Sequence, residues 1–406
     1  MSRVVPRQLE PCIRGSIFMF LSLCWHSAVC NTVSAAEDKL TPTVELREEF
    51  NDNIFLTQGN QRSDFITTIV PSLVFTHMTE RRNISLLAAL NRHSYNRTEH
   101  INTTDNQYHG QFEQKIAEMS NAGMSADYLR NTRADSIDTT TGLPSSAAST
   151  HFQYTVNASR SLSEFASATL AYSFAKDEYD NQASQGNQSH TVNVQLSEDL
   201  DRMVPRLKGS LSAQYNKALY RDSDIDNYTL KGGVKRAVTE KLSTNLSFGG
   251  RFTHSTFSVI HIPSLTLSTD NSDGWGIIGA ASLNFTGEKN FAALSFSRDF
   301  SAASGQVGAV ERTSFDLALG RAITDRITSQ FVASYSINQA SSGQFSSGKS
   351  DDRPFNIKAD LTYRISNNFD FGVQYAYYAV TYGYSDIRVV QNSVMMRAIV
   401  KYPYIL

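Results

Sequence analysis

Cysteine is missing from almost all of the 406-residue chain. Its three cysteines are Cys12, Cys24 and Cys30, at the N-terminal end. If that end is removed on export, the remaining chain can form no disulfide, no thiolate metal site and no cysteine nucleophile. Such a composition suits an exported protein whose stability has another source.

The chain also lacks long apolar runs and a surplus of charge. After the N-terminal segment no stretch has 18 uninterrupted apolar residues, so we predict no transmembrane helix. The net charge is −2, and loss of the three arginines and one glutamate of residues 1–35 would make it −4. Nucleic acid is therefore not an expected partner. Tryptophan (2) is scarce but phenylalanine (23) and tyrosine (18) are plentiful, which favours strands.

Residues 1–35 predict a signal peptide. Arginines give this segment a basic start, and its apolar run, 17–25, is too short for a bilayer, which needs roughly 20 residues. The sequence Val-Ser-Ala at 33–35 offers a cleavage site, so we expect the mature chain to begin at Ala36. The alternative for this segment is a buried helix. We expect one further domain, residues 36–406.

From residue 41 onward, apolar residues recur at every second position, which is the period of a β-strand. Clear examples are residues 190–197, 207–216 and 355–364. In the last of these, Phe, Ile, Ala, Leu and Tyr alternate with Asn, Lys, Asp, Thr and Arg. Each run has about ten residues, the length of a tilted strand that crosses a bilayer.

The connections between these runs alternate between short turns and longer polar loops. Residues 219–227, 254–272 and 338–353 are examples of the longer kind. Outer-membrane barrels show this asymmetry, with short periplasmic turns and long external loops. The predicted fold class is therefore all-β, a transmembrane antiparallel up-and-down β-barrel of about 18 strands, with 16 as the alternative. An even number places both termini on the periplasmic side.

A soluble β-sandwich or β-solenoid would alternate as well. Eighteen strands are too many for one ordinary sandwich, and no repeated motif indicates a solenoid. Aromatic residues also lie near strand ends on the apolar face, as in the girdles of membrane barrels. These residues are Phe152, Tyr154, Tyr172, Phe174, Tyr228, Trp275, Phe285, Phe369, Tyr375 and Tyr377.

The last 13 residues, 394–406, alternate in the same way and resemble the C-terminal signal that the outer-membrane barrel insertion machinery reads. That signal usually ends in Phe or Trp, whereas this chain ends in Leu406. We expect the insertion machinery to be a partner through this strand, and outer-membrane lipid or lipopolysaccharide to surround the barrel.

Residues 44–55 read V-E-L-R-E-E-F-N-D-N-I-F, and S-D-F-I-T follows at 63–67, before Pro71 and Leu73. This signature resembles that of the outer-membrane β-barrel porins encoded with exosortase or exopolysaccharide systems. The specific likeness covers about 30 residues. The resemblance implies a barrel in the outer membrane, with periplasmic polysaccharide-export proteins as candidate partners. It does not identify a cargo.

The sequence contains only weak or incomplete matches to motifs that bind metal ions or carry out catalysis. The stretch 222–227 starts like a calcium loop, but Asn227 and Gly233 stand where an EF-hand needs glycine and glutamate. A solvated loop is preferred there to a weak surface cation site. The histidines show no paired metal spacing, and no Gly-x-Ser-x-Gly motif occurs. A Ser–His pair from separate strands remains an alternative. We predict no cofactor, no metal and no enzymatic activity.

Strand parity places several charged residues on the polar face, which lines the lumen of a barrel. Rings of charge tune the selectivity of pores. The alternative is that these residues only wet the lumen. They are Lys208, Lys231, Lys235, Arg251, Lys358, Asp360, Arg364, Asp370, Arg397 and Lys401.

The predicted function is a porin-like channel for passive passage of a hydrophilic solute or polymer across the cell outer membrane. Loops such as 254–272 and 338–353 are candidates for folding inward and narrowing it. One alternative is an outer-membrane component of exopolysaccharide export or assembly. Another is a non-conducting barrel that acts in adhesion or as a lipid-modifying enzyme.

Overall fold

The computed structural model describes residues 36–405, apart from 139–140, 146, 182–185, 222, 262–265, 303–308, 341–349 and 384. The predicted signal peptide, residues 1–35, lies outside the described residues. In the described part of the chain, no helix is long and apolar enough to cross a membrane. A single turn of 3-10 helix, η1 (Glu99–Ile101), follows the third strand.

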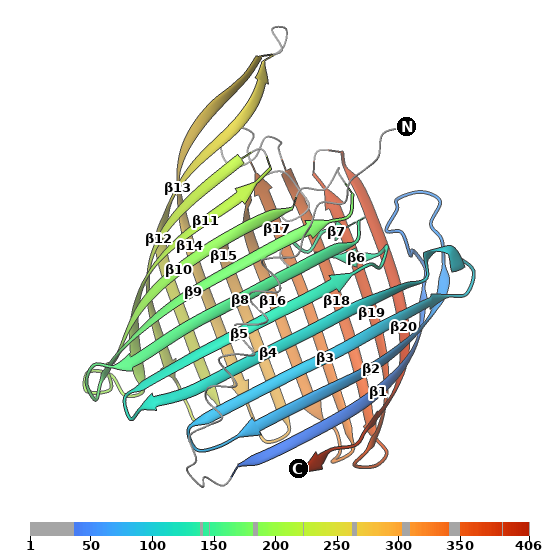
Figure 1. Cartoon of the computed structure of the whole chain (residues 1–406), viewed down its shortest axis with the longest axis horizontal. Coiled ribbons are helices and arrows are strands. Elements are labelled where there is room, and N and C mark those ends of the chain that lie inside the picture. The colour runs from blue at the N-terminus through green and yellow to red at the C-terminus, as the bar shows by residue number, and fades with distance from the viewer. Residues whose placement is uncertain are drawn as a thin grey trace, which may run out of the picture. The chain divides into compact units, whose positions relative to one another are not determined.

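Eighteen long strands follow one another around a ring, each antiparallel to its neighbours (Figure 1). They are β1 (Glu37–Asn51), β2 (Asp64–Met78), β3 (Arg82–Tyr95), β4 (Thr103–Ala117), β5 (Ser120–Asn131), β8 (Ser149–Ser161), β9 (Ala166–Tyr179), β10 (Asn187–Asp199), β11 (Leu207–Tyr220), β12 (Ser223–Ala237), β13 (Leu242–His261), β14 (Thr266–Thr286), β15 (Asn290–Ala302), β16 (Ala309–Ala322), β17 (Ile327–Ala340), β18 (Ser350–Arg364), β19 (Phe369–Tyr382) and β20 (Ile387–Lys401). Three short strands are β6 (Ser136–Ile137), β7 (Pro144–Ser145) and β21 (Tyr404–Ile405).

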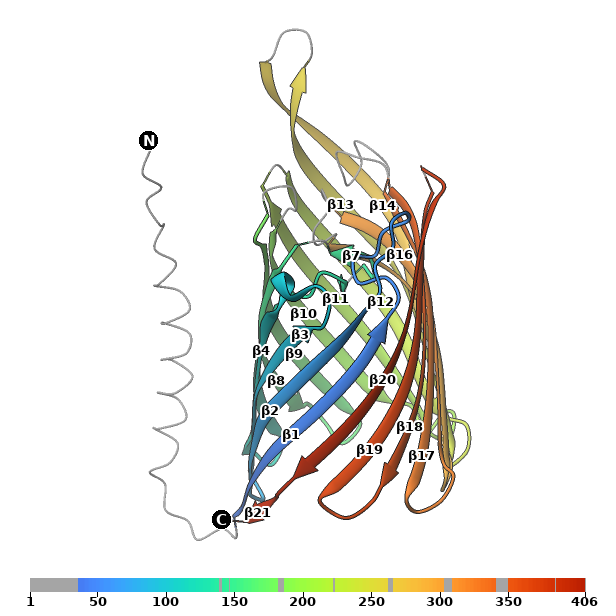
Figure 2. The same ribbon diagram turned by 90° about the vertical axis from the view of Figure 1, so that its right-hand side faces the viewer.

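The first and last long strands close the ring. β1 pairs with β2 on one side and with β20 on the other, from Thr43 opposite Lys401 to Asn51 opposite Ser393 (Figure 2). Each long strand therefore has a neighbour on both sides, so the ring has no free edge strand. The predicted closed antiparallel barrel of 18 strands is confirmed.

Side chains alternate between two unlike faces. On β12, Ile225 and Asn227 are buried on one face, whereas Tyr228 and Leu230 on the other face are 50% and 57% exposed. Buried residues of this kind point into the ring, because neighbouring strands and inward segments enclose them there. The exposed apolar residues therefore cover the outside, which suits a surface that contacts hydrocarbon rather than water.

A belt of aromatic residues runs around this outer face. Tyr215 on β11 lies opposite Tyr228, which lies opposite Phe252 on β13, which lies opposite Trp275 on β14. The ring centroids of successive pairs are 5.1, 6.3 and 4.9 Å apart. Phe296 of β15 and Phe315 of β16 form a separate aromatic pair on the outer face, with ring centroids 5.0 Å apart, and Phe296 lies opposite Ala281 of β14. Such belts mark the interface of a bilayer with water.

Two segments predicted to be loops are strands instead. The polar stretch 219–227 is a tight hairpin, because β11 runs to Tyr220 and β12 begins at Ser223. Ser223, Ile225 and Asn227 alternate inward there, so the expectation of a solvated loop was wrong. Likewise 254–272 is mostly a β-ribbon, since β13 and β14 pair as far as His261 and Thr266. The expectation of a long loop there was therefore wrong, and the β13–β14 ribbon extends beyond the neighbouring strands (Figure 1). Residues 341–349, the middle of the third loop, lie outside the described residues.

Candidate functional site

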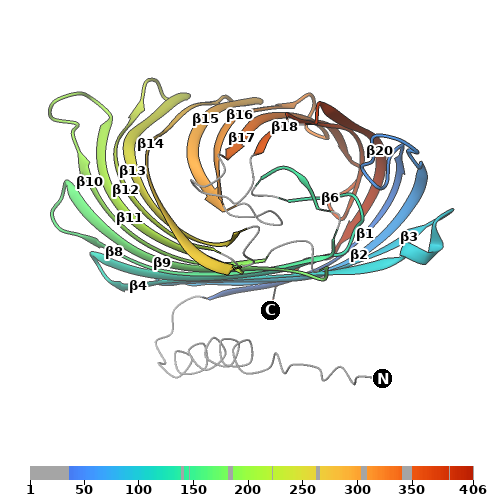
Figure 3. The ribbon, with the colours of Figure 1, turned by 90° about the horizontal axis from the view of Figure 1, so that it is seen from above.

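The interior holds the connection between β5 and β8, residues 132–148. Figure 3 shows its strand β6 inside the ring. Within this inward segment β6 and β7 pair, with Ser136 opposite Ser145 and Ile137 opposite Pro144. We call the described residues of this connection, 132–138, 141–145 and 147–148, the inward segment below. Its contacts with the inner wall make it the feature of the fold best placed to control passage.

An ionic contact anchors the start of the inward segment. The Arg133 guanidinium donates hydrogen bonds to Glu49 of β1 at 2.9 and 3.1 Å and to Asp135 at 2.8 and 2.9 Å. Asp135 also accepts hydrogen bonds from Asn51 at 2.8 Å and from Gln391 of β20 at 3.1 Å. The Asp135 side chain is only 5% exposed, so these partners replace water around it.

These contacts shift both ionisation equilibria of the pair. Burial raises the pKa of Asp135, but Arg133 and the hydrogen bonds from Arg133 and Gln391 outweigh burial and lower that pKa below 3.8. Burial likewise lowers the pKa of Arg133, and the charges of Asp135 and Glu49 outweigh it and raise that pKa. Both groups are therefore charged at neutral pH, and each stabilises the other.

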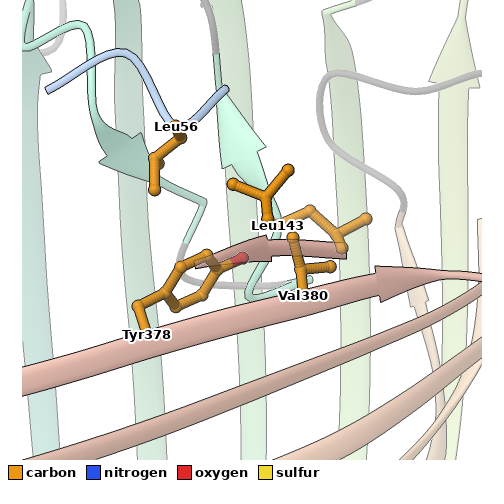
Figure 4. Packing of buried hydrophobic residues seen from close by; sticks show 5 residues of the cluster. Leu56, Leu143, Tyr378 and Val380 are labelled. Atoms are coloured by element: carbon orange, nitrogen blue, oxygen red, sulfur yellow. The ribbon is translucent and has the colours of Figure 1, made fainter. Parts of the chain in front are cut away.

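An apolar cluster holds the tip of the inward segment. Leu143 packs with Leu56, from the loop after β1, and with Tyr378 and Val380 of β19 (Figure 4). The Tyr378 hydroxyl donates a 2.9 Å hydrogen bond to the Gly142 carbonyl. Gly142 has φ +72°, a left-handed conformation that glycine adopts without steric cost. Burial of each large side chain here contributes about 1.5–3 kcal/mol.

Residues 51–54 of the N-terminal signature lie at the centre of these contacts. Asn51, Asn53 and Ile54 are completely buried. The Asn53 amide donates to the carbonyls of Thr57 at 2.9 Å and Val390 at 2.8 Å, and Gln391 donates to the Asn53 carbonyl at 3.0 Å. The signature thus fixes the loop after β1 to β20, beside the inward segment. Sequence reasoning gave it no structural role, although an Asn-Asp-Asn run directly after a strand was the available signal.

A second polar chain supports the inward segment at this same, N-terminal end. One ring nitrogen of His93 shares a hydrogen bond with the Thr68 hydroxyl (2.9 Å), and the other shares one with the Asp105 carboxylate (3.0 Å). Asp105 also accepts hydrogen bonds from the hydroxyl and the backbone N–H of Thr132, at 2.6 and 2.7 Å. The order Thr–His–Asp is reminiscent of a nucleophile triad. However, Thr68 is 2% and His93 4% exposed, so no substrate reaches them. Their contacts instead fix Thr132, where the inward segment begins.

Metal ligands do not gather in the interior. Among the described residues, no group of three or more His, Cys, Asp or Glu side chains is placed to hold a metal ion. The inner-face pairs His109–Asp127 and His151–Asp177, each 2.6 Å apart, are isolated contacts between neighbouring strands.

Five of the predicted lumen charges form a group on β18, β19 and β20. The Arg397 guanidinium lies 2.8 Å from the Asp360 carboxylate. It reaches Asp360 by crossing β19 at Gly372, where a Cβ atom would come within 2.8 Å of the Arg397 side chain. Lys401 lies 2.8 Å and Arg364 4.0 Å from Asp370. The charges of this group therefore neutralise one another in part.

The remaining five charges differ in their surroundings. Lys208 lies 3.8 Å from Asp199 near a turn. Lys231, Lys235 and Lys358 share the parity of inward residues on β12 and β18, and none of them has an ion pair with a described residue. Arg251 is 1% exposed and contacts Glu311 at 2.6 Å. Its side chain is enclosed by protein, so it does not line the lumen.

The fold and this interior define a large closed β-barrel with an inward-folded, anchored segment. No family model and no curated protein sequence matches the chain. Among solved structures it is similar to OccAB4 of Acinetobacter baumannii, with 10% identity and a TM-score of 0.47 over 91% of this chain and 98% of that one. It is also similar to OpdL of Pseudomonas aeruginosa (12%, 0.41, 92% and 99%) and to the alcaligin outer-membrane receptor FauA of Bordetella pertussis (11%, 0.41, 89% and 76%). At such low identity the likeness concerns the fold alone.

Proposed function

We propose that the protein is a channel of the cell outer membrane through which hydrophilic solutes diffuse, narrowed by the inward segment. The observation that carries the proposal is the anchored inward segment inside a closed barrel of 18 strands. Barrels of 16 to 18 strands are wide enough to leave an aqueous channel. An apolar outer face with an aromatic belt supports a location in a bilayer, and closed barrels of this kind belong to outer membranes.

The wall charges favour anions over cations of the same size. Lys231, Lys235 and Lys358 on the inner face have no neutralising carboxylate among the described residues, whereas Asp360 and Asp370 are paired with basic groups. A low-dielectric wall focuses the field of unpaired charges into the lumen. No covalent step is required, and the protein acts in this proposal as a passage rather than an enzyme.

Conductance of purified protein in planar bilayers tests the proposal. Removing residues 136–145, with Gly-Ser joining the ends, should raise single-channel conductance because it removes the tip of the inward segment. Removal of 342–350, which the sequence also suggested as a constriction, is the matched deletion. Stable channels in the full chain, widened by the first deletion, support the proposal. Absence of channels in all three proteins would favour adhesion or a lipid-modifying activity.

A more specific proposal is membership of the exopolysaccharide-associated barrel family. Asn51, Asn53 and Ile54, which carry the resemblance, are buried where the loop after β1 contacts β20 and the inward segment, and Asp64, also buried, lies opposite Asn51 and accepts hydrogen bonds from the Arg97 backbone. A signature with this role would be retained wherever the constriction serves the same cargo. The candidate partners are periplasmic polysaccharide-export proteins, and the insertion machinery that reads the C-terminal strand. Loss of surface polysaccharide on gene deletion, restored by the intact chain but not by Asn53→Ala, would support it. Unchanged polysaccharide would argue for a general porin.

A further inference from the structure

The barrel wall is interrupted on its upper side between β14 and β15. These strands pair only from Gly279 opposite Arg298 to Thr286 opposite Phe291. β14 nevertheless continues to Thr266, still paired with β13, and β15 continues to Ala302, still paired with β16. Two hairpins therefore separate at this point, and the separation is a seam in the wall.

Side chains across the seam show that the upper part of β15 and β16 lies inside the wall. Arg251 points inward from β13 and contacts Glu311 of β16 at 2.6 Å. Its guanidinium also lies over the ring of Phe300 of β15, 4.6 Å from the centroid. Gly276 of β14 makes room for this arrangement, because a Cβ there would overlap the Arg251 guanidinium. The side of the β15–β16 hairpin that carries Phe300 and Glu311 thus covers the inner face of β13 and β14.

Phe300 fills an apolar site on the inner wall. It packs against Ala218, Tyr220 and Ile225, at the upper ends of β11 and β12, which are 1%, 7% and 0% exposed. This cluster is unusual for an inner face that is otherwise polar on these strands. The Arg251 guanidinium lies next to it. A cationic group beside an apolar slot is the arrangement that recognises a carboxylate with an aliphatic chain.

The level of the seam suits a ligand that comes from the membrane surface. Trp275 of β14, which packs against Phe252 on the outer face, lies beside the unpaired part of the seam, and Phe296 of β15 lies in the paired part, opposite Ala281. Aromatic belts lie at the headgroup level of a bilayer. The unpaired backbone above Gly279 is therefore near water and headgroups rather than in hydrocarbon, where it would be costly.

We propose that this is a binding site for an anionic amphiphile, a long-chain carboxylate, that the protein's own residues occupy in the present structure. Glu311 holds the place of the ligand's carboxylate on Arg251, and Phe300 holds the place of its chain on Ala218, Tyr220 and Ile225. The ligand enters through the seam when Phe300 of β15 and Glu311 of β16 move away from Arg251. This binding activity is separate from solute diffusion and does not depend on it.

The two halves of one ion pair give opposite expectations. Glu311→Gln removes the competing carboxylate and should tighten binding of dodecanoate about threefold or more, whereas Arg251→Gln removes the ligand's partner and should weaken it about tenfold or more. Phe300→Ala should also tighten binding. Dodecanoate bound to the full mature protein, held in amphipol, is measured by equilibrium dialysis with radiolabelled ligand.

Matched probes and variants make the test decisive. Hexanoate has the carboxylate of dodecanoate without its long chain, and dodecyltrimethylammonium has the long chain without the carboxylate. Both should therefore bind at least about tenfold more weakly than dodecanoate. Arg364→Gln, on the wall of β18, should leave binding unchanged. Heat-dependent gel mobility verifies that each variant is folded. Failure of folded Glu311→Gln to bind dodecanoate, a loss of affinity in both Glu311→Gln and Arg251→Gln, or equal binding of dodecyltrimethylammonium would overturn the proposal.

Discussion

At the scale of single residues, the two faces of each strand are under opposite physical demands. Leu361 of β18 is 46% exposed on the outer face, and Lys358, three residues earlier, has the parity of inward residues. The same strand therefore contacts hydrocarbon with one side chain and the aqueous interior with the other. This contrast allows the register of the strand to be tested.

Leu361→Arg should impair insertion much more than Lys358→Glu. An arginine at a lipid-facing midplane position costs roughly 2–4 kcal/mol, whereas a change of charge inside the lumen mainly alters selectivity. The fraction of protein that shows heat-dependent gel mobility after refolding into lipid measures insertion. Equal tolerance of the two variants would mean that Leu361 and Lys358 do not lie on opposite faces.

Asp135 predicts an acid-sensitive constriction. Its folded pKa is lowered from 3.8, so its ion pair stabilises the inward segment fully above 3.8, and this stabilisation declines below 3.8 and is lost as pH falls through the lower, folded pKa. Protonation leaves Arg133 with Glu49 alone, at a cost of about 1–3 kcal/mol. Conductance in bilayers should therefore stay constant between pH 6 and pH 3.8, and should rise reversibly once the pH falls through the folded pKa of Asp135, which lies below 3.8.

The variant Asp135→Asn identifies the group responsible. It keeps the shape of the side chain but cannot titrate, so conductance should be raised at pH 6 and should change less on acidification. An unchanged pH profile in this variant would show that Asp135 is not the group responsible.

At the scale of elements, the strands could be predicted from the sequence but the inward segment could not. A strand shows its period within ten residues, as at 355–364, because each side chain reports the face on which it lies. The inward segment is held by Asn51 and Gln391, which are 84 and 256 positions from Asp135. No local pattern reveals partners so distant, and the segment's own sequence has no period.

A related cause explains why strand residues near the loop ends were predicted to be loops. Polar composition predicted a loop at 219–227, where Ser223, Ile225 and Asn227 point inward and complete β12. Inside a barrel the inner face tolerates polar residues, so the contrast between strand and loop weakens near the loop end. Arg251 illustrates the same limit for sites. Parity placed it on the inner face, but only the structure shows that Glu311 and Phe300 cover it.

At the scale of the whole molecule, charge is distributed unequally around the inner wall. The paired group on β18, β19 and β20 combines Asp360 and Asp370 with three basic residues, of which Lys401 and Arg397 are close to a carboxylate and Arg364 is more distant. Lys231 on β12 and Lys358 on β18 add positive charge without a paired acid among the described residues. The field beside Lys231 and Lys358 is therefore expected to be positive, although the chain carries a net charge of −2.

The triple variant Lys231→Glu, Lys358→Glu and Arg364→Glu should reverse this selectivity. Each change replaces a positive by a negative charge on the inner face, where a low-dielectric wall strengthens its effect on permeating ions. The zero-current potential in a tenfold KCl gradient should have the sign of anion selectivity for the unmodified protein and should move toward cation selectivity in the variant.

The control replaces Lys217, on the outer face of β11, by glutamate and should leave the potential unchanged. If the triple variant keeps the potential of the unmodified protein, these side chains do not face the permeation path. Because salt screens charge over about 10 Å at 0.1 M, the difference should shrink as both solutions are made more concentrated.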